Sequence, residues 1–157
     1  MIHLNFRSEL AAPADEVWAK VSTMAGVNHE LHPWVHMTVP VSFGGRSLQE
    51  ATPEELKGVL FNSVLLGLRC IPFDVHALHL DQVQMGQGFD EHSTSWMHKT
   101  WIHRRRVIPA GSGCVVTDEL IVEPRVFFMA PIVRGIVGFL FRHRHRRLQQ
   151  TFGSRPA

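Results

Sequence analysis

The sequence predicts an α+β fold in which a curved antiparallel sheet of about seven strands wraps around one long C-terminal helix. Three observations predict it. Apolar residues alternate with polar ones over residues 2–10, which is the period of a half-buried strand. Further strand-like runs follow one another through most of the chain, separated by short turns. The segment from about Pro131 to Phe152 carries apolar residues at helical spacing, so it forms the closing helix.

Two short helices are expected after the first strand. Pro13 suits a first helical turn, and Asp15 and Glu16 follow it, where the positive end of a helix dipole favours acidic residues. Residues 24–32 form the second helix. Pro33 ends that helix, because the residue before a proline disfavours the helical region.

The middle of the chain is expected to continue as strands. Residues 59–73 are almost entirely apolar, so periodicity alone leaves strand and helix open. Strand is favoured because Gly67 and the β-branched residues lower helix propensity, and Pro72 ends the run. Residues 44–58 are a connection that contains one helical turn at 53–56. The remaining expected strands cover residues 34–43, 74–83, 88–95, 96–108 and 114–123.

The closing helix divides into two halves of different composition. Gly135 and Gly138 lie in its first half and leave room beside the sheet, either for a ligand or for close packing. Residues 142–147, with the sequence RHRHRR, lie in its second half. We expect this second half to present a solvated basic face and to seal one end of the barrel. A pocket is therefore expected under the first half.

Composition and charge exclude several classes of protein. The chain has 157 residues, of which 45% are hydrophobic and 19% charged, as is typical of one globular domain. The net charge of +2 includes the four arginines of residues 142–147, so the rest of the chain carries +2 − 4 = −2. Because the basic character is local, we expect no nucleic-acid partner. Cys70 and Cys114 lie in apolar surroundings, which indicates buried, inert thiols more than a disulfide.

Hydropathy indicates neither a signal peptide nor a membrane span. The N-terminus lacks the continuous apolar segment of a cleavable signal. Residues 126–141 are apolar, but they contain Pro131 and Arg134 and are shorter than the roughly 20 residues that a spanning helix needs. We therefore expect a cytoplasmic protein.

Three stretches resemble the START-like superfamily, also called SRPBCC or helix-grip proteins. They are PADEVWAKVSTMAGVNHELHPWVHMTVP (13–40), TWIHRRRV with VVTDELIVEP (100–124), and LFRHRHRRLQQTFG (140–153). The last is similar to the closing helix of an uncharacterised bacterial subgroup. The resemblance implies a single START-like domain over residues 1–157. It also implies a mostly apolar cavity between the sheet and the last helix, with a few polar groups.

The last hairpin carries the candidate site residues. With a turn centred on Ala110 and Gly111, His103 faces Asp118 and Arg105 faces Val116, and opposed residues point to the same side of the sheet. That side also carries apolar residues of the last strand, so we expect Asp118 inside, next to His103, with Arg105 nearby. Glu91 has the same parity on the preceding strand. The set either orients a ligand or transfers protons, or it is a satisfied structural ion-pair network.

Other chemistry is weakly indicated. Trp101 can line the cavity, as can Trp34 and Trp96, although plain core residues are the commoner use of tryptophan. The eleven histidines lack metal-ligand spacing, so we expect no metal site. No serine has a nucleophile-elbow context, and no cofactor is expected.

Three functions are therefore compared. The first is the binding or transport of a hydrophobic or amphipathic small molecule of lipid, polyketide or isoprenoid type. The second is an enzyme that resembles a polyketide cyclase or dehydratase, in which His103 with Asp118 or Glu91 moves protons and Arg105 polarises a carbonyl. The third is attachment to a membrane surface through the basic end of the last helix and residues 126–141. A monomer and a homodimer both remain open.

Overall fold

The computed structural model describes residues 1–156, which fold into an antiparallel sheet, three α-helices and three short 3-10 helices. The strands are β1 (Ile2–Leu10), β2 (Val35–Met37), β3 (Phe61–Gly67), β4 (Ile71–Leu78), β5 (Leu80–Gln84), β6 (Gly88–Ser95), β7 (His98–Ala110) and β8 (Gly113–Pro124). The helices are α1 (Ala14–Val21), α2 (Met24–Leu31), η1 (Leu48–Glu50), η2 (Glu55–Lys57), η3 (Phe127–Met129) and α3 (Ala130–Phe152).

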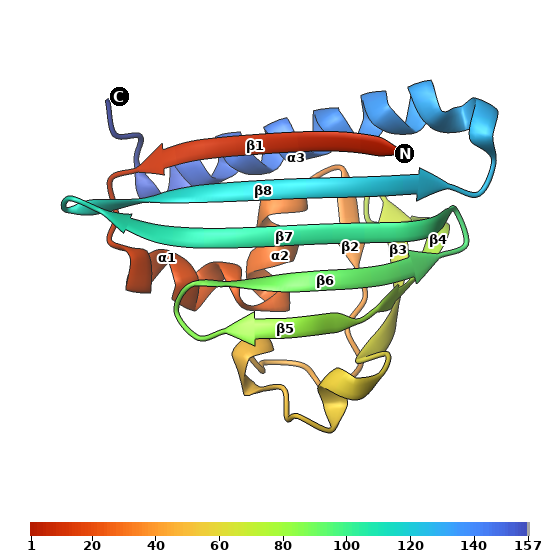
Figure 1. The fold of residues 1–157 in the computed structure, drawn as a ribbon, viewed down its shortest axis with the longest axis horizontal. Helices are drawn as coiled ribbons and strands as arrows, with labels where there is room; N and C mark the ends of the chain where they lie inside the picture. Colours follow the sequence, from red (N-terminus) through yellow and green to blue (C-terminus); the bar gives the residue numbers. More distant parts are fainter. Residues whose placement is uncertain (157) are drawn as a thin grey trace.

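The sheet has the strand order β1-β8-β7-β6-β4-β3-β2, and β5 pairs with β6 beside this path. Its neighbouring strands are antiparallel, as the succession of strands and short turns predicts. Figure 1 shows α1, α2 and α3 on one side of the sheet, with α3 lying behind β1 and β8. A curved sheet that wraps around a long C-terminal helix is the helix-grip fold, so the predicted fold is confirmed.

The predicted element boundaries hold at both ends of the chain. Residues 2–10 form β1, and the two short helices follow it as expected. The side chain of Thr23 accepts a hydrogen bond from the amide of Gly26 and caps α2. At the other end of the chain, Pro131 lies in the first turn of α3. Gly153 ends α3 with φ of 75°, a left-handed conformation that favours glycine.

The middle of the chain differs from its prediction at three places. The strand expected over 34–43 is only β2, because the following residues form turns in which the amide of Phe43 bonds the carbonyl of Pro40. The run 59–73 is neither one strand nor a helix. It contains β3, a tight turn and the start of β4, and Leu68 and Arg69 occupy positive φ in that turn. The sequence does not reveal this division, because two apolar strands joined by a turn without glycine look like one continuous apolar segment.

The third difference concerns residues 74–83, which were expected as one strand. They belong to β4 and β5, which are interrupted at His79. His76 pairs with Ser95, and Leu80 pairs with Glu91, so the two strands continue one register along β6. The sheet therefore contains eight strands instead of about seven.

The second half of α3 also differs from its prediction. Arg144, His145 and Leu148 are buried against the sheet and α2, and of the basic residues here Arg142 and Arg146 are the exposed ones. The expected solvated basic face is therefore wrong for its centre. Charged side chains enter the interior here because carboxylates on α2 and β8 pair with them.

Candidate ligand cavity and its buried ionic network

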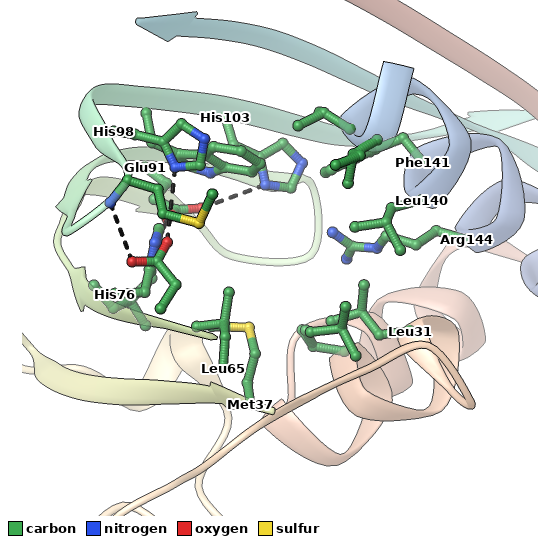
Figure 2. A pocket seen from close by; sticks show the side chains of 18 of the residues that line it. Leu31, Met37, Leu65, His76, Glu91, His98, His103, Leu140, Phe141 and Arg144 are labelled. Atoms are coloured by element: carbon green, nitrogen blue, oxygen red, sulfur yellow. Dashed lines mark hydrogen bonds and ion pairs between the residues drawn. The ribbon is translucent and has the colours of Figure 1, made fainter. Parts of the chain in front are cut away.

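A cavity of about 210 Å³ lies between the first half of α3, the sheet and α2 (Figure 2). This is where the sequence places the pocket. The lining is mostly aliphatic, aromatic or thioether: Met24, Val27, Leu31, Val35, Met37, Leu48, Leu65, Phe73, Leu78, Leu80, Phe89, Met97, Trp101, Val133, Ile136, Val137, Leu140 and Phe141. Six lining residues are polar or charged: Asp74, His76, Glu91, His98, His103 and Arg144. The lining thus combines an apolar volume with a few polar groups, as small-molecule sites do.

Glu91 is the centre of the polar wall formed by the sheet. Its Oε1 atom is 2.7 Å from Nε2 of His76 and accepts a hydrogen bond of 2.7 Å from Oγ of Ser93. Its Oε2 atom lies 3.4 Å from Nδ1 of His103. Burial raises the pKa of Glu91, but the bonds from His103 and His76 outweigh burial and hold that pKa well below its usual value. Glu91 is therefore an ionised acceptor in the cavity wall.

A second histidine–carboxylate pair lies farther along the same wall. Nδ1 of His98 is 3.8 Å from Oδ2 of Asp74 and 3.1 Å from Oγ of Ser95. Burial lowers the pKa of His98 and outweighs the opposite effect of Asp74, so the neutral ring is favoured. The indole of Trp101 packs against the rings of both His98 and His76, with centroids 5.5 and 6.0 Å apart.

Asp118 lies behind this wall and accepts four hydrogen bonds. Oδ1 accepts from Nε of Arg105 and faces Nε2 of His103, both at 2.7 Å. Oδ2 accepts from Nη2 of Arg105 at 2.7 Å and faces Nε2 of His145 at 2.9 Å. Burial raises the pKa of Asp118, and the charge and bonds of Arg105 outweigh it, so the pKa lies well below its usual value. Ser8 completes this end through a contact of 2.7 Å with Nδ1 of His145.

The predicted register of the β7–β8 hairpin is wrong by two residues. The turn lies at Gly111 and Ser112, so Arg105 pairs with Asp118, and His103 pairs with Leu120. A shift of two residues preserves the face to which every side chain points. Asp118, His103 and Arg105 therefore meet inside the protein despite the wrong pairing.

Glu30 of α2 joins the hairpin to α3. Its Oε1 atom accepts a bond of 2.7 Å from Nη1 of Arg105, and its Oε2 atom accepts one of 2.9 Å from Nε of Arg144. Burial raises the pKa of Glu30, but the two guanidiniums outweigh it and the net shift is downward. Sequence reasoning missed Glu30, Arg144, His145 and Ser8. The one available signal was Glu30, an acid among the apolar residues of a short helix.

The predicted ligand-binding residues fall into three groups. Trp101, His103 and Glu91 line the cavity. Arg105 and Asp118 do not line it; Arg105 is fully buried, and Nε, Nη1 and Nη2 each bond a carboxylate. This corrects the expectation that Arg105 polarises a ligand carbonyl. The guanidinium that reaches the cavity is that of Arg144, opposite the histidines in Figure 2.

The third group comprises the two glycines of α3, whose expected placement is corrected. Gly135 is exposed, and a Cβ atom built there meets nothing within 4 Å. Gly138 is buried, but a Cβ atom there would meet the Arg142 side chain of the same helix at 3.2 Å. Neither glycine faces the cavity. Room for a ligand comes instead from the spacing between α3 and the sheet. Trp34 and Trp96 also lie outside the lining and are exposed.

Two further properties bear on the chemistry of the site. Within residues 1–156, no three histidine, cysteine or carboxylate side chains are grouped so that they could hold a metal ion. The helices of these residues include none with the length and apolar character required to cross a bilayer.

Comparison with solved structures identifies the fold of the chain. It is similar to a START superfamily protein from Mycobacterium smegmatis, with a TM-score of 0.67, 15% identity and 96% of each chain covered. A protein from Chromobacterium violaceum matches with a TM-score of 0.71, 10% identity and 98% of each chain covered. A protein in the dynemicin biosynthetic locus matches with a TM-score of 0.58 and 13% identity, over 98% of this chain and 49% of that one. The fold is therefore START-like.

Residues 8–152 match the model of the family DUF8410, which is described as a domain of unknown function, and the chain belongs to this family. No curated protein matches the sequence.

Proposed function

We propose that this protein binds a small hydrophobic or amphipathic molecule in the cavity under the first half of α3. The observation that carries the proposal is an open volume of about 210 Å³ with a mostly apolar lining inside an otherwise packed domain. Cores are normally filled to the density of organic crystals, and an apolar cavity of this kind binds apolar ligands in preference to water. The START-like fold supports the same proposal, because members of the superfamily commonly bind hydrophobic ligands.

The volume limits the size of the ligand. An engineered cavity of about 150 Å³ holds benzene, so this one takes a molecule with somewhat more heavy atoms. A medium-length alkyl chain or a single substituted ring fits that volume. A longer lipid or a polycyclic polyketide requires α3 to move away from the sheet, or part of the ligand to remain outside.

Direct binding of octan-1-ol tests the proposal. Isothermal titration calorimetry should give one saturable site, and native mass spectrometry of protein purified without added ligand should reveal any molecule carried from the host. Val137 lines the cavity, whereas Ile132 of the same helix is exposed and does not line it. Val137→Phe should therefore weaken octanol binding at least about tenfold, and Ile132→Phe should leave it unchanged. Equal binding by the two variants, or no binding by the native chain, would overturn the proposal.

A second candidate function is acid–base catalysis on a bound carbonyl compound. The observation that favours it is the presence of two histidine–carboxylate pairs, His76 with Glu91 and His98 with Asp74, in the cavity wall. A histidine beside a carboxylate is the usual general base, and a neutral His98 is in the form that accepts a proton. The cyclase-like hypothesis therefore moves from His103, which is held between two carboxylates, toward His76 and His98.

Proton exchange on a ketone tests this second function. In D₂O, octan-2-one should exchange its α-protons for deuterons faster with the native protein than with His76→Gln or His98→Gln, as followed by proton NMR. His92→Gln is the matched control, because His92 lies on β6 and does not line the cavity. Exchange that equals the buffer rate would exclude this reaction class for the site.

Exposed apolar residues at one end of the molecule support a lipid surface as a partner. The lining residues Phe73, Met97 and Ile136 are exposed and mark the cavity mouth. Near it, the β6–β7 turn and η3 meet through a bond from the amide of Arg125 to the carbonyl of Met97. The exposed apolar residues of these two segments are Trp96, Met97, Val126, Phe127 and Phe128. Clusters of this kind mark interaction sites.

Vesicle sedimentation decides between this apolar end and the basic end of α3 that the sequence suggests. Binding through Phe127 and Phe128 should occur on phosphatidylcholine vesicles, persist at high salt, and disappear in the double variant Phe127→Ser, Phe128→Ser. Binding through arginines requires anionic lipid and weakens as salt rises. Failure to sediment with either vesicle would exclude a membrane partner under these conditions.

A further inference from the structure

Arg144 is a buried cation with an unused hydrogen-bonding edge inside the cavity. Its side chain is 6% exposed, and Nε donates to Oε2 of Glu30 at 2.9 Å. Within residues 1–156, no group accepts a hydrogen bond from Nη1 or Nη2. The guanidinium packs 4.7 Å from the centroid of the Phe141 ring and projects into the cavity, toward the wall that carries Glu91 and His103 (Figure 2).

The two Nη atoms of Arg144 are accessible from the cavity, since among residues 1–156 the one fully buried side-chain nitrogen or oxygen without a partner is Oγ of Ser63. Leaving a buried donor unsatisfied costs the desolvation of that group, and the cost is higher for a charged group. The fork formed by Nη1 and Nη2 matches the two oxygens of a carboxylate, with two parallel hydrogen bonds. The aliphatic lining around the cavity offers no such acceptor, so a ligand or a water molecule must provide it.

Arg105 shows within the same network how one guanidinium serves two carboxylates. Its Nε and Nη2 atoms bond the two oxygens of Asp118, and its Nη1 atom bonds Glu30. Arg144 shares the partner Glu30 with Arg105, but it has no second carboxylate partner in the described chain. Where Arg105 has the carboxylate of Asp118 as its second partner, the free Nη atoms of Arg144 face the cavity.

We infer that the ligand is an amphipathic carboxylic acid whose carboxylate pairs with Nη1 and Nη2 of Arg144 while its apolar part fills the cavity. This inference rests on the proposed function and adds the chemical class of the ligand. The carboxylates already in the wall do not compete for this position, because Glu91 is bonded to His76 and Ser93, and Asp74 accepts from backbone amides.

Two probes of equal chain length test the inference: octanoate and octan-1-ol. Calorimetric titration of the native protein should give an affinity for octanoate at least about tenfold higher than for octanol. A charge-assisted hydrogen bond between the carboxylate and Arg144 accounts for a difference of this size. Arg144→Met should remove this preference and leave octanol binding within about twofold. Arg146→Met is the matched control, because Arg146 is exposed on the same helix, and it should keep the native preference.

Arg144→Lys serves as a second variant if Arg144→Met does not fold, which circular dichroism would reveal. Lysine keeps the charge but lacks the planar fork, so it should lower the octanoate preference to a few-fold. Equal affinities of the native protein for the two probes, or a preference that survives in Arg144→Met, would overturn the inference and leave the proposed function intact. Absence of binding for both probes would instead overturn the proposed function itself, and the inference with it.

Discussion

The two halves of α3 cover the same sheet, but one half covers a cavity and the other covers a filled interior. In the first half (residues 130–141), Val133, Val137 and Phe141 face open volume. In the second half (residues 142–152), Arg144, His145 and Leu148 are buried, and the first two pair with Glu30 and Asp118. An ionic network thus fixes one end of the helix, and the other end need not be packed to native density for the protein to fold.

Stability and the proposed binding therefore depend on different parts of one helix, and Arg144 contributes to both. Breaking the ionic network leaves uncompensated buried charge, whereas altering the cavity wall changes contacts that are incomplete already. Matched substitutions at the two ends should therefore change the free energy of unfolding by different amounts.

Asp118→Ala should have the largest effect on stability. It removes the acceptor of four hydrogen bonds and leaves Arg105 without its bidentate partner, which should cost about 3–5 kcal/mol of unfolding free energy. Urea denaturation followed by circular dichroism measures the loss. Glu119→Ala is the control, because Glu119 is the exposed neighbour on β8 and its pair with Arg104 lies at the surface. It should cost less than about 1 kcal/mol. Similar losses for the two variants would contradict the importance of the network.

Truncation of one leucine in each half of α3 should lower the free energy of unfolding by different amounts. Leu148 is 2% exposed in the packed end, so Leu148→Ala should cost about 2–5 kcal/mol. Leu140 lines the cavity and has fewer partner atoms on that side, so Leu140→Ala should cost less than half as much. Thermal unfolding of the two variants measures the difference. A larger loss at Leu140 would show that the cavity end is packed as tightly as the other.

Stability should decrease as the pH is lowered. Burial raises the pKa values of Glu30, Glu91 and Asp118, and their partners outweigh it, so the folded protein holds fewer protons on them than the unfolded chain. Their stabilisation is complete above the unfolded values, 4.5 for Glu and 3.8 for Asp, and is lost below them. Below its unfolded pKa, each such carboxylate can lose at most about 1.4 kcal/mol of stabilisation per pH unit.

His98 adds a smaller loss of the same sign near pH 6.5. Burial lowers its pKa from 6.5, so the unfolded chain takes up the proton first as the pH falls. Melting temperatures between pH 7 and pH 3 measure both changes. Glu91→Gln is the control variant, and its melting temperature should fall less steeply below pH 4.5. A melting temperature that rises or stays constant toward pH 3 would contradict the charged state of the network.

The addition of one methylene group should have the smallest effect in the cavity and a larger one in the packed end. Val137 faces open volume, so Val137→Ile should change the unfolding free energy by less than about 1 kcal/mol. Val116 is fully buried on β8 and outside the cavity lining, so Val116→Ile should destabilise by about 1–3 kcal/mol. Chemical denaturation of both variants checks this, and equal losses would mean that the cavity is closed in solution.

Much of the fold could be predicted from the sequence, because its signals are local. Alternation over residues 2–10 and helical spacing over residues 131–152 each extend over enough residues to identify the element. The β7–β8 register was wrong, because a turn at Gly111 and Ser112 and one at Ala110 and Gly111 have similar composition. The hairpin turn at Leu68 and Arg69 was missed, because neither residue type favours a turn.

Of the candidate site, only the residues that lie on the sheet could be predicted from the sequence. His103, Arg105, Asp118 and Glu91 meet inside because strand parity is a local property, and an error of two residues leaves it unchanged. Their separation into a cavity wall and a layer behind it depends on α2 and α3. Glu30 is 75 residues from Arg105 in sequence, and Arg144 is 114 residues from Glu30. No spacing rule relates positions that far apart.

The overall order of elements, the curved antiparallel sheet and the long closing helix follow from the sequence alone, because each depends on hydrophobic periodicity along a continuous segment. Which arginines enter the interior depends on tertiary contacts. RHRHRR has the composition of a solvated face, and its central arginine is buried only because Glu30, from another helix, compensates the charge. Tertiary contacts also decide that the volume beneath the first half of α3 stays open, since unfilled volume depends on how distant side chains pack together.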